Sequence, residues 1–334
     1  MPLPDTERLT LNRRRLLQAA GVGAATVAAP AAGAAYPHVP AGALVAETVS
    51  VAAIQRRVAS AAVAANVRGM CDDIDRAQEA GRKHLITFSG RALQGAVMGN
   101  ERDLRAVAIG ADGPEVAAIA GKAREHGTFV SFGAWATDRD WPDHVIEMSF
   151  LIGPNGTVLA RDWAPIGDDV SVPSAGRFAA TVESEFEPYM EMYGDRGLLP
   201  VHGTSIGAIA QAPVIGAPEI FRAYALKGAE VFLRTASHGY RAWDAQAAAG
   251  HNHCFSIMTT AAATEADPAA MFAGHGGRTA IFGPTGDVIA EAGSTWEQTL
   301  TASLPMAAYR AEHRRPKLQA ALILPAFEQA RGIV

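Results

Sequence analysis

Short apolar stretches and helically spaced apolar residues alternate from the first third of the chain onward. The segment VSVAAIQ at 49–55 is apolar and β-branched at alternate positions, which predicts a buried strand. Residues 66–81 carry apolar side chains at helical spacing and end at a glycine, so they predict an amphipathic helix with Cys71 on its buried face. The pattern therefore begins with a strand followed by a helix.

The same alternation continues through the next fifty residues. A strand is expected at 84–88, followed by a loop, and then by a helix that opens at Pro114 and closes near Gly127. The apolar stretch at 128–136 predicts another strand. Because strand, helix and strand follow one another, these strands are expected to be parallel neighbours in one sheet.

A tight turn interrupts this alternation. Residues 145–152 and 157–161 flank the sequence Gly-Pro-Asn-Gly at 153–156, whose asparagine and glycine tolerate positive φ, so a β-hairpin is expected and the sheet should be mixed. Residues 167–200 carry acidic residues, glycine, proline and tyrosine without clear periodicity. They predict a long surface excursion near a pocket.

The second half of the chain repeats the alternation of strands and helices without a visible linker or repeat. Strands are expected at 205–210, 230–234 and 254–260, helices at 218–227 and 242–253, and three further strands within 277–304.

Composition narrows the possible classes of protein. The chain has 334 residues, of which 49% are hydrophobic and 19% charged, enough apolar material for one large α/β domain or two small ones. The formal charge of -5 and the scattered arginines argue against a nucleic-acid partner. The two cysteines, Cys71 and Cys254, form no zinc-binding spacing, so no metal and no cofactor is expected.

The N-terminus has the order of features typical of an export signal. Three arginines at 13–15 precede an alanine-rich apolar run at 19–29, and the small residues at 32–34 suit a signal peptidase. The paired arginines resemble a twin-arginine signal, so the mature chain is expected to begin near Ala35, outside the cytoplasm, in the periplasm or beyond. The apolar run is too short for a stable membrane span.

These features divide the chain into four predicted parts. They are a twin-arginine-like signal peptide at 1–35, a short linker at 36–46, the main domain at 47–310 and a C-terminal extension at 311–334.

Four segments, taken in order, resemble the carbon-nitrogen hydrolases of the nitrilase superfamily, and the aliphatic amidases in particular. They are PNGTVLARDW at 154–163, PEIFRAYALKGAEVFLRTASHGY at 218–240, HNHCFSIMTTAA at 251–262 and GRTAIFGPTGDVIAEAG at 277–293. The resemblance implies an α/β fold, a four-layer α-β-β-α sandwich with mixed sheets. It also implies a homodimer or larger homo-oligomer that pairs through one helical layer.

Active enzymes of this superfamily resemble one another in a triad of glutamate, lysine and cysteine, which act as base, cation and nucleophile. The matching positions hold Gly90, Ala164 and Ala212, with Trp163 at the lysine position if the register slips by one. Glycine cannot move a proton, and a methyl group cannot attack a carbonyl carbon. The resemblance therefore implies a protein that has lost the classical cysteine mechanism.

The inventory of lysines and cysteines gives the same result. Cys71 falls in the first helix, and Cys254 falls in a segment that resembles a non-catalytic part of the family. None of the four lysines lies near the exit of the hairpin; they are Lys83, Lys122, Lys227 and Lys317.

Other polar residues near predicted strand ends are candidates for the lining of a pocket. They are Ser89, Arg91, Arg161, Asp162, Trp163, Gln211, Arg234 and His238. For Arg161 and Asp162 an ion pair or a solvated hairpin end is the favoured interpretation over a substrate role. Ser89 lacks the surroundings of a catalytic serine and is better explained as a turn residue. Trp163 could fill the space left by the lysine.

Two functions remain open. The first is an exported, catalytically degenerate relative that acts as a binder of a small amide, nitrile or carboxylate, or as an assembly partner. The alternative is an active amide or nitrile hydrolase that uses non-standard residues of the pocket, for instance Asp162 with a bound water, which the fold alone does not exclude.

Overall fold

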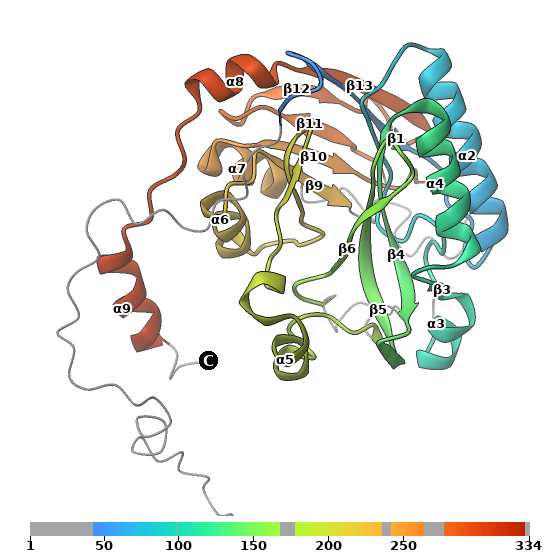
Figure 1. Cartoon of the computed structure of the whole chain (residues 1–334), viewed down its shortest axis with the longest axis horizontal. Coiled ribbons are helices and arrows are strands. Elements are labelled where there is room, and N and C mark those ends of the chain that lie inside the picture. Colours follow the sequence, from blue (N-terminus) through green and yellow to red (C-terminus); the bar gives the residue numbers. More distant parts are fainter. Residues whose placement is uncertain (1–42, 98, 168–177, 236–241, 264–276, 331–334) are drawn as a thin grey trace, which may run out of the picture. The chain divides into compact units, whose positions relative to one another are not determined.

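The computed structural model describes residues 43–330 except for residue 98 and the segments 168–177, 236–241 and 264–276 (Figure 1). These residues belong to one compact unit, Pro37–Val334. The predicted signal peptide at 1–35 and the candidate His238 lie outside the described residues. Within the described part, no helix is long and apolar enough to cross a membrane.

The first sheet combines parallel and antiparallel strands. Its order is β13-β1-β2-β4-β5-β6, with β3 paired to β4. Strands β1, β2 and β4 run parallel to one another. Strand β13 pairs antiparallel with β1, and β5 pairs antiparallel with β4 and with β6. The strands are β1 Val49–Gln55, β2 Leu85–Thr87, β3 Ile109–Gly110, β4 Phe129–Asp138, β5 Trp141–Ile152, β6 Val158–Trp163 and β13 Gln298–Leu304.

The second sheet has the order β12-β11-β10-β9-β8-β7. Its central strands β8, β9 and β10 are parallel, and the outer strands pair antiparallel. Its strands are β7 His202–Thr204, β8 Gly207–Gln211, β9 Val231–Thr235, β10 Phe255–Thr259, β11 Ala280–Phe282 and β12 Val288–Glu291.

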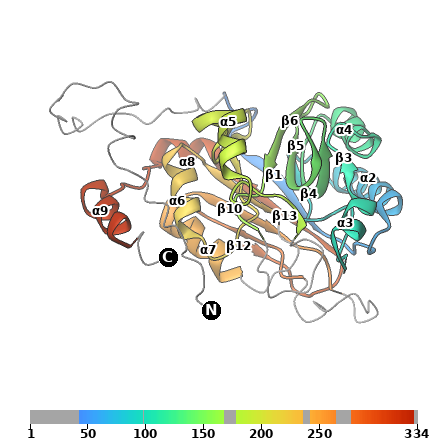
Figure 2. The same cartoon turned by 90° about the horizontal axis from the view of Figure 1, so that it is seen from below.

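Helices cover the outer faces of both sheets, so the two sheets face each other between two helical layers (Figure 2). Helices α2 (Val63–Glu79) and α4 (Pro114–His126) cover the first sheet, and α6 (Pro218–Leu226) and α7 (Ala242–Asn252) cover the second. This arrangement confirms the predicted nitrilase-like α-β-β-α sandwich with mixed sheets. The remaining helices are α3 Glu101–Val107, α5 Phe186–Gly197, α8 Met306–Glu312 and α9 Ala320–Ala330.

Local sequence explains where the covering helices begin, end and bury their side chains. Helix α4 starts with Pro114 after Gly113 and ends at Gly127, which adopts the left-handed conformation with φ 60°. Helix α2 buries Met70 and Ile74 against the first sheet. Cys71 lies at the edge of this face, partly buried and packed against the same cluster as Met70 and Ile74.

The predicted hairpin forms between β5 and β6. The turn closes with a hydrogen bond from the Gly156 N–H to the Gly153 carbonyl, and Gly156 takes a positive φ of 79°. The strands pair antiparallel, as the turn chemistry predicts.

Four of the described helices were not anticipated from the pattern: α3, α5, α8 and α9. Helix α3 lies in the predicted loop after β2, where Asn100 and Asp103 form a reciprocal capping box. Helix α5 lies in the predicted excursion at 167–200 and packs through Tyr189, but Gly194 interrupts its helical geometry. Helices α3 and α5 are short and bury few apolar side chains, so their periodicity was weak.

The space between the sheets is apolar where the parallel strands begin. Inward-facing residues from both sheets form one cluster there, including Val51, Leu85, Phe129, Val231 and Phe255. This apolar half holds the two sheets together by burying surface from both of them.

Candidate functional site

Polar side chains occupy the interior between the sheets at the carboxyl ends of the parallel strands. Along each strand the inward-facing positions change from apolar to polar, in the pairs Ala53 and Gln55, Leu85 and Thr87, Leu233 and Thr235, and Ile257 and Thr259. In open α/β sheets this end of the strands is where ligands bind. We call this region the polar half of the interior.

Hydrogen bonds between side chains join the two sheets across the polar half. The hydroxyls of Thr87 and Thr259 lie 2.6 Å apart, and those of Ser149 and Thr235 lie 3.2 Å apart. The Gln55 side-chain oxygen accepts from the Thr279 N–H at 2.9 Å, next to β11 of the second sheet. Each of these bonds links a residue of the first sheet to a residue in or directly beside the second.

Gln211 and Asp162 form the centre of this network. The Gln211 amide nitrogen donates to the Asp162 carboxylate at 3.0 Å and to the Ser149 carbonyl at 3.0 Å. Its amide oxygen accepts from the Ser131 hydroxyl at 3.1 Å. His202 Nε2 lies 3.0 and 2.8 Å from the two Asp162 carboxylate oxygens. Asp162 is thus a buried carboxylate with two polar partners, as buried charges require.

The two residues at the hairpin end have different surroundings and do not pair with each other. Arg161 forms an ion pair with Asp112 on the surface, while Asp162 points between the sheets and is 7% exposed. Because successive strand residues face opposite sides of a sheet, the two side chains point apart.

The position matching the family glutamate is filled by close backbone contact. Gly90 follows β2 and is buried against β4. A Cβ added to Gly133 of β4 would lie 2.9 Å from the Gly90 Cα and 3.3 Å from the Thr235 hydroxyl. This approach of two backbones requires glycine at position 133.

The position predicted to match the family lysine is also buried. Ala164 is fully buried, and its N–H donates to the Glu147 carbonyl at 2.8 Å. Trp163 packs into an aromatic cluster, 4.7 Å from the Trp141 ring and 5.4 Å from the Tyr189 ring. Its side chain therefore belongs to the core on the helix side of the first sheet, whereas Asp162 faces the interior.

The position matching the cysteine carries a methyl group in an apolar environment. Ala212 is fully buried in the cluster beneath α6, together with Phe221 and Tyr224. Its N–H donates to the Leu233 carbonyl, and the preceding Gln211 carbonyl accepts from the Tyr224 hydroxyl. These contacts fix the backbone of Ala212, and its methyl side chain is not a nucleophile.

The remaining candidates lie around these positions rather than in one constellation. Arg91, with a positive φ of 54°, lies over the Trp135 ring at 4.9 Å and 3.8 Å from Glu147. Arg234 is 1% exposed and lies 3.9 Å from Asp244 on the α7 side of the second sheet. Ser89 is fully buried, and its hydroxyl has no hydrogen-bond partner among the described residues.

The two thiols lie away from the polar half. Cys254 precedes β10 at the opposite end of the sheet, where its thiol lies against the Ala229 and Asn252 carbonyls and burial raises its pKa. Cys71 lies in the outer helical layer, where burial raises the pKa of its thiol although Lys122 lowers it. Neither thiol has the low pKa of a nucleophilic cysteine.

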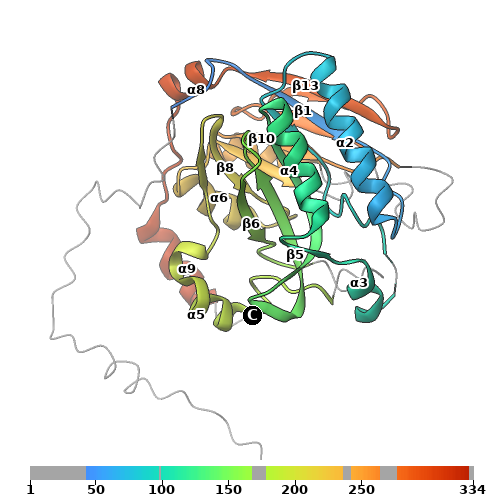
Figure 3. The same cartoon turned by 45° about the vertical axis from the view of Figure 1, so that its right-hand side comes forward.

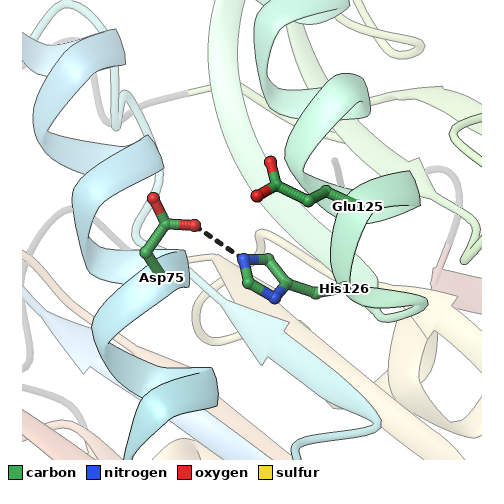
Figure 4. A group of neighbouring side chains, drawn as sticks. All are labelled: Asp75, Glu125 and His126. Carbon is green, nitrogen blue, oxygen red and sulfur yellow. Dashed lines mark hydrogen bonds and ion pairs between the residues drawn. The ribbon is translucent and has the colours of Figure 1, made fainter.

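A cluster of charged groups lies between α2 and α4 (Figure 4). Asp75, Glu125 and His126 bring three possible metal-ligand atoms within 4.8 Å of one another. However, the Lys122 ammonium lies 2.8 Å from Asp75 and 3.0 Å from Glu125. The hydrogen bonds with Asp75 and Glu125 raise the pKa of Lys122, so this cluster is a surface ion-pair network with its own cation.

Sequence reasoning missed the partners of Gln211 and Asp162. His202, Ser131 and Ser149 were not among the candidates, although each serine lies between two apolar residues of its strand. A polar side chain at an inward-facing position requires a hydrogen-bond partner, so each serine indicates that another polar group lies close to it. His202 carried no comparable signal, because β7 has three residues and lies 40 residues from Asp162.

Comparison with known proteins identifies the class. The sequence profile of the family described as carbon-nitrogen hydrolase matches residues 50–314. The chain therefore belongs to the carbon-nitrogen hydrolase family, within the nitrilase superfamily. A comparison with curated proteins gave no match.

Solved structures share the fold. An amidase from Nesterenkonia sp. AN1, studied as a double mutant in complex with acrylamide, superposes with a TM-score of 0.61 at 17% identity, covering 86% of this chain and 98% of the amidase. Nit3 of Saccharomyces cerevisiae, a member of branch 10 of the nitrilase superfamily, gives a TM-score of 0.61 at 16% identity, covering 81% and 97%. At these identities the likeness establishes the fold alone.

Proposed function

We propose that this chain is an exported member of the carbon-nitrogen hydrolase family that has lost the cysteine mechanism and acts as a binder or assembly partner. The observation that carries this proposal is the chemistry at the three matching positions. Gly90, Ala164 and Ala212 supply no base, cation or nucleophile, and both thiols lie elsewhere. With all three groups replaced, no weakened version of the mechanism remains.

The proposed ligand is a small amide, nitrile or carboxylate. The polar half of the interior supports it, because this end of the parallel strands is the place where an α/β sandwich can present hydroxyl and amide groups to a ligand. The proposed protein works in the periplasm or outside the cell after export by the twin-arginine route. It also forms a homodimer or larger homo-oligomer through one helical layer.

The decisive experiment measures ammonia release from small aliphatic amides and nitriles, with an active amidase assayed in parallel. We expect no release, and a thermal-shift series with acetamide, acetonitrile and acetate should raise the Tm, since a ligand of the folded state stabilises it. Ammonia release that iodoacetamide abolishes would refute the proposed loss of the cysteine mechanism. If no compound changes the Tm, the proposed binding of a small ligand is refuted and the role as an assembly partner remains.

Export has its own test. Expression of the full chain, followed by N-terminal sequencing of the purified protein, should give a start near Ala35. Replacing Arg13 and Arg14 by lysine should retain the protein in the cytoplasm, whereas Arg8→Lys is a matched control that should not. An uncleaved chain in the cytoplasm would contradict the proposal.

A second function is favoured by one specific observation, the pair of Asp162 and His202. A buried carboxylate that holds a part-exposed imidazole can orient it as a general base for water. Under this alternative, hydrolysis survives Cys71→Ser combined with Cys254→Ser, and Asp162→Asn abolishes it. Under the first proposal, none of these variants differs from the parent protein in turnover.

A further inference from the structure

A cavity of about 630 Å³ lies at the end of the second sheet where β10 begins. Phe255, the first residue of β10, lines this cavity, whereas Thr259, the last residue, belongs to the polar half of the interior. The other walls come from the turn between β11 and β12 and from α8, and they include Pro284 and Pro305. Figures 1 and 3 both show α8 and α5 at opposite ends of the sandwich. The cavity is therefore separate from the candidate functional site.

Hydrogen bonds fix α8, which forms one wall of the cavity, to the second sheet and its helical layer. Arg310 donates to the two carboxylate oxygens of Glu230, directly before β9, at 2.7 and 2.8 Å. The Tyr309 hydroxyl donates at 2.9 Å to the carbonyl of His253, the residue after α7. A preformed cavity of this size with a largely apolar lining is typical of a small-molecule site.

One wall of the cavity is aromatic. The Tyr309 ring lies 5.0 Å from the Phe255 ring and 4.5 Å from the His313 imidazole. Ile289 of β12 and Pro305 extend this wall with aliphatic surface. The wall can cover the apolar body of a ligand, and aromatic rings also attract an organic cation.

The imidazole in this wall presents a hydrogen-bond acceptor. The Nε2 atom of His313 lies 3.5 Å from the Tyr309 oxygen, whose own proton is donated to the His253 carbonyl. The ring proton therefore belongs on Nε2, and Nδ1 is left as an acceptor. This Nδ1 is buried and has no hydrogen-bond partner among the described residues. A buried acceptor of this kind favours a ligand with N–H donors.

The charged groups of the lining carry an excess of negative charge. Asp287 and Glu312 are exposed carboxylates, and neither forms an ion pair within the described part of the chain. Among the lining residues that the structure describes, Arg314 is the one group with a permanent positive charge, and its guanidinium donates to the Glu312 and His313 carbonyls at 3.2 and 3.0 Å. Two carboxylates thus accompany one guanidinium that is already turned toward the end of α8. This balance favours a cation over an anion.

We propose that this cavity binds a small organic ammonium ion with an apolar body. The ammonium group contacts the Asp287 and Glu312 carboxylates at the rim, and the body packs against the aromatic wall. The site goes beyond the proposed function, since it shares no residue with the network around Asp162 and Gln211.

The first test compares three probes that share a ring and differ in charge: benzylamine, benzyl alcohol and benzoate. Isothermal titration calorimetry should show that benzylamine binds about tenfold more tightly than the other two, because hydrogen bonds to charged groups are the stronger ones. Equal affinities would show that the cavity does not discriminate by charge. Tighter binding of benzoate would assign the recognition to Arg314. Either result, or the absence of benzylamine binding, would overturn the proposal.

Substitutions in the cavity locate the binding. Ala308→Trp fills the cavity from α8 and should abolish benzylamine binding. Ala311→Trp is the matched control, because Ala311 is exposed on the same helix and is not among the lining residues, and it should bind like the parent protein.

A second pair of variants tests the charge without changing the size of a side chain. Glu312→Gln should weaken benzylamine binding about threefold to fivefold, the range expected for a part-exposed ion pair. Glu291→Gln, at an exposed position of β12 outside the cavity, should leave the affinity unchanged. Benzylamine affinity that survives both Ala308→Trp and Glu312→Gln would place the ligand elsewhere and overturn the proposal.

These outcomes are separable from those of the proposed function. The Tm shifts expected with acetamide, acetonitrile and acetate concern the polar half of the interior. Ala308→Trp should leave those shifts unchanged while it abolishes the response to benzylamine.

Discussion

The two halves of the space between the sheets are built from different side chains on the same strands. Where the parallel strands begin, the inward-facing residues are apolar and form one cluster. Where they end, the inward-facing residues are Thr, Ser, Gln and Asp, and their hydrogen bonds cross from one sheet to the other. The first half stabilises the sandwich by burial alone, whereas the second half must satisfy every polar group that it buries.

The polar half is held together by contacts among its own side chains. Here the central carboxylate, Asp162, is already engaged by His202 and Gln211. The polar side chains at the carboxyl ends of the strands therefore bond to one another across the two sheets.

The largest effect is expected from a truncation in the apolar half. Phe255→Ala removes a ring that is 1% exposed and packs 5.0 Å from the Tyr309 ring. The free energy of unfolding should fall by about 3–5 kcal/mol, because both burial and packing are lost. Urea denaturation measures this change. Val288→Ala, at an exposed apolar position, should cost less than about 0.5 kcal/mol.

A smaller loss is expected at the centre of the polar half. Gln211→Leu keeps a side chain of similar size but removes a donor to Asp162 and the acceptor of Ser131. The free energy of unfolding should fall by about 1–3 kcal/mol, because buried polar groups are left unsatisfied. Gln319→Leu, on the exposed C-terminal segment, is the control and should be nearly neutral. Equal stability of the two variants would show that the network contributes nothing.

The cross-sheet hydroxyl pair allows a sharper comparison. Thr87→Val and Thr259→Val should each cost about 1 kcal/mol, since each leaves one hydroxyl without its partner. The double variant should cost less than the sum, because two methyl groups then face each other without an unsatisfied hydroxyl. A double-mutant cycle in urea measures this coupling. Strict additivity would mean that the two hydroxyls are satisfied elsewhere.

The smallest effect concerns pH at the start of β2. Burial, together with the charge of Arg82, lowers the pKa of His84, whose Nδ1 accepts the Ser50 N–H. At pH values below about 6.5, the ordinary pKa of histidine, the unfolded chain therefore binds more protons than the folded chain. The contribution of His84 to the free energy of unfolding is fully present above this pH and is lost as the pH falls through the folded-state pKa of His84. Tm should decrease between neutral pH and pH about 5.

A control variant isolates this contribution. His84→Gln should have a weaker dependence of Tm on pH than the parent protein. Some dependence will remain, because burial also lowers the pKa of His313. A variant with an unchanged slope would exclude His84 as a source.

Sequence reasoning was most successful where local patterns decide the structure. The residues of the apolar stretch at 49–55 and of the Gly-Pro-Asn-Gly turn determine the local backbone conformation themselves. Both elements form as predicted. Helix α5 was missed because its first turns bury only Tyr189 and Gly194 interrupts it. The predicted division of the chain at 35, 46 and 310 remains a prediction.

The candidate site was harder to predict because its contacts join distant residues. Gln211 and Asp162 were both candidates, but nothing in the sequence joined them, since they come from different sheets and are 49 residues apart. The contact between Gly90 and Gly133 depends on how closely two backbones approach, which no residue pattern encodes. Arg161 was grouped with Asp162 because they are adjacent in sequence, although their side chains lie on opposite faces.

The hydrogen bonds across the sandwich also constrain how the two sheets can slide. Apolar contacts can re-form after a strand moves along its neighbour, but hydroxyl and amide partners cannot, because their bonds have a narrow range of distance and angle. A shear of one residue, about 3.3 Å, would break the links from Thr87, Ser149 and Gln211 together. The polar ends of the strands thus fix the alignment of the two sheets, so the geometry of the fold depends on them whatever ligand they meet.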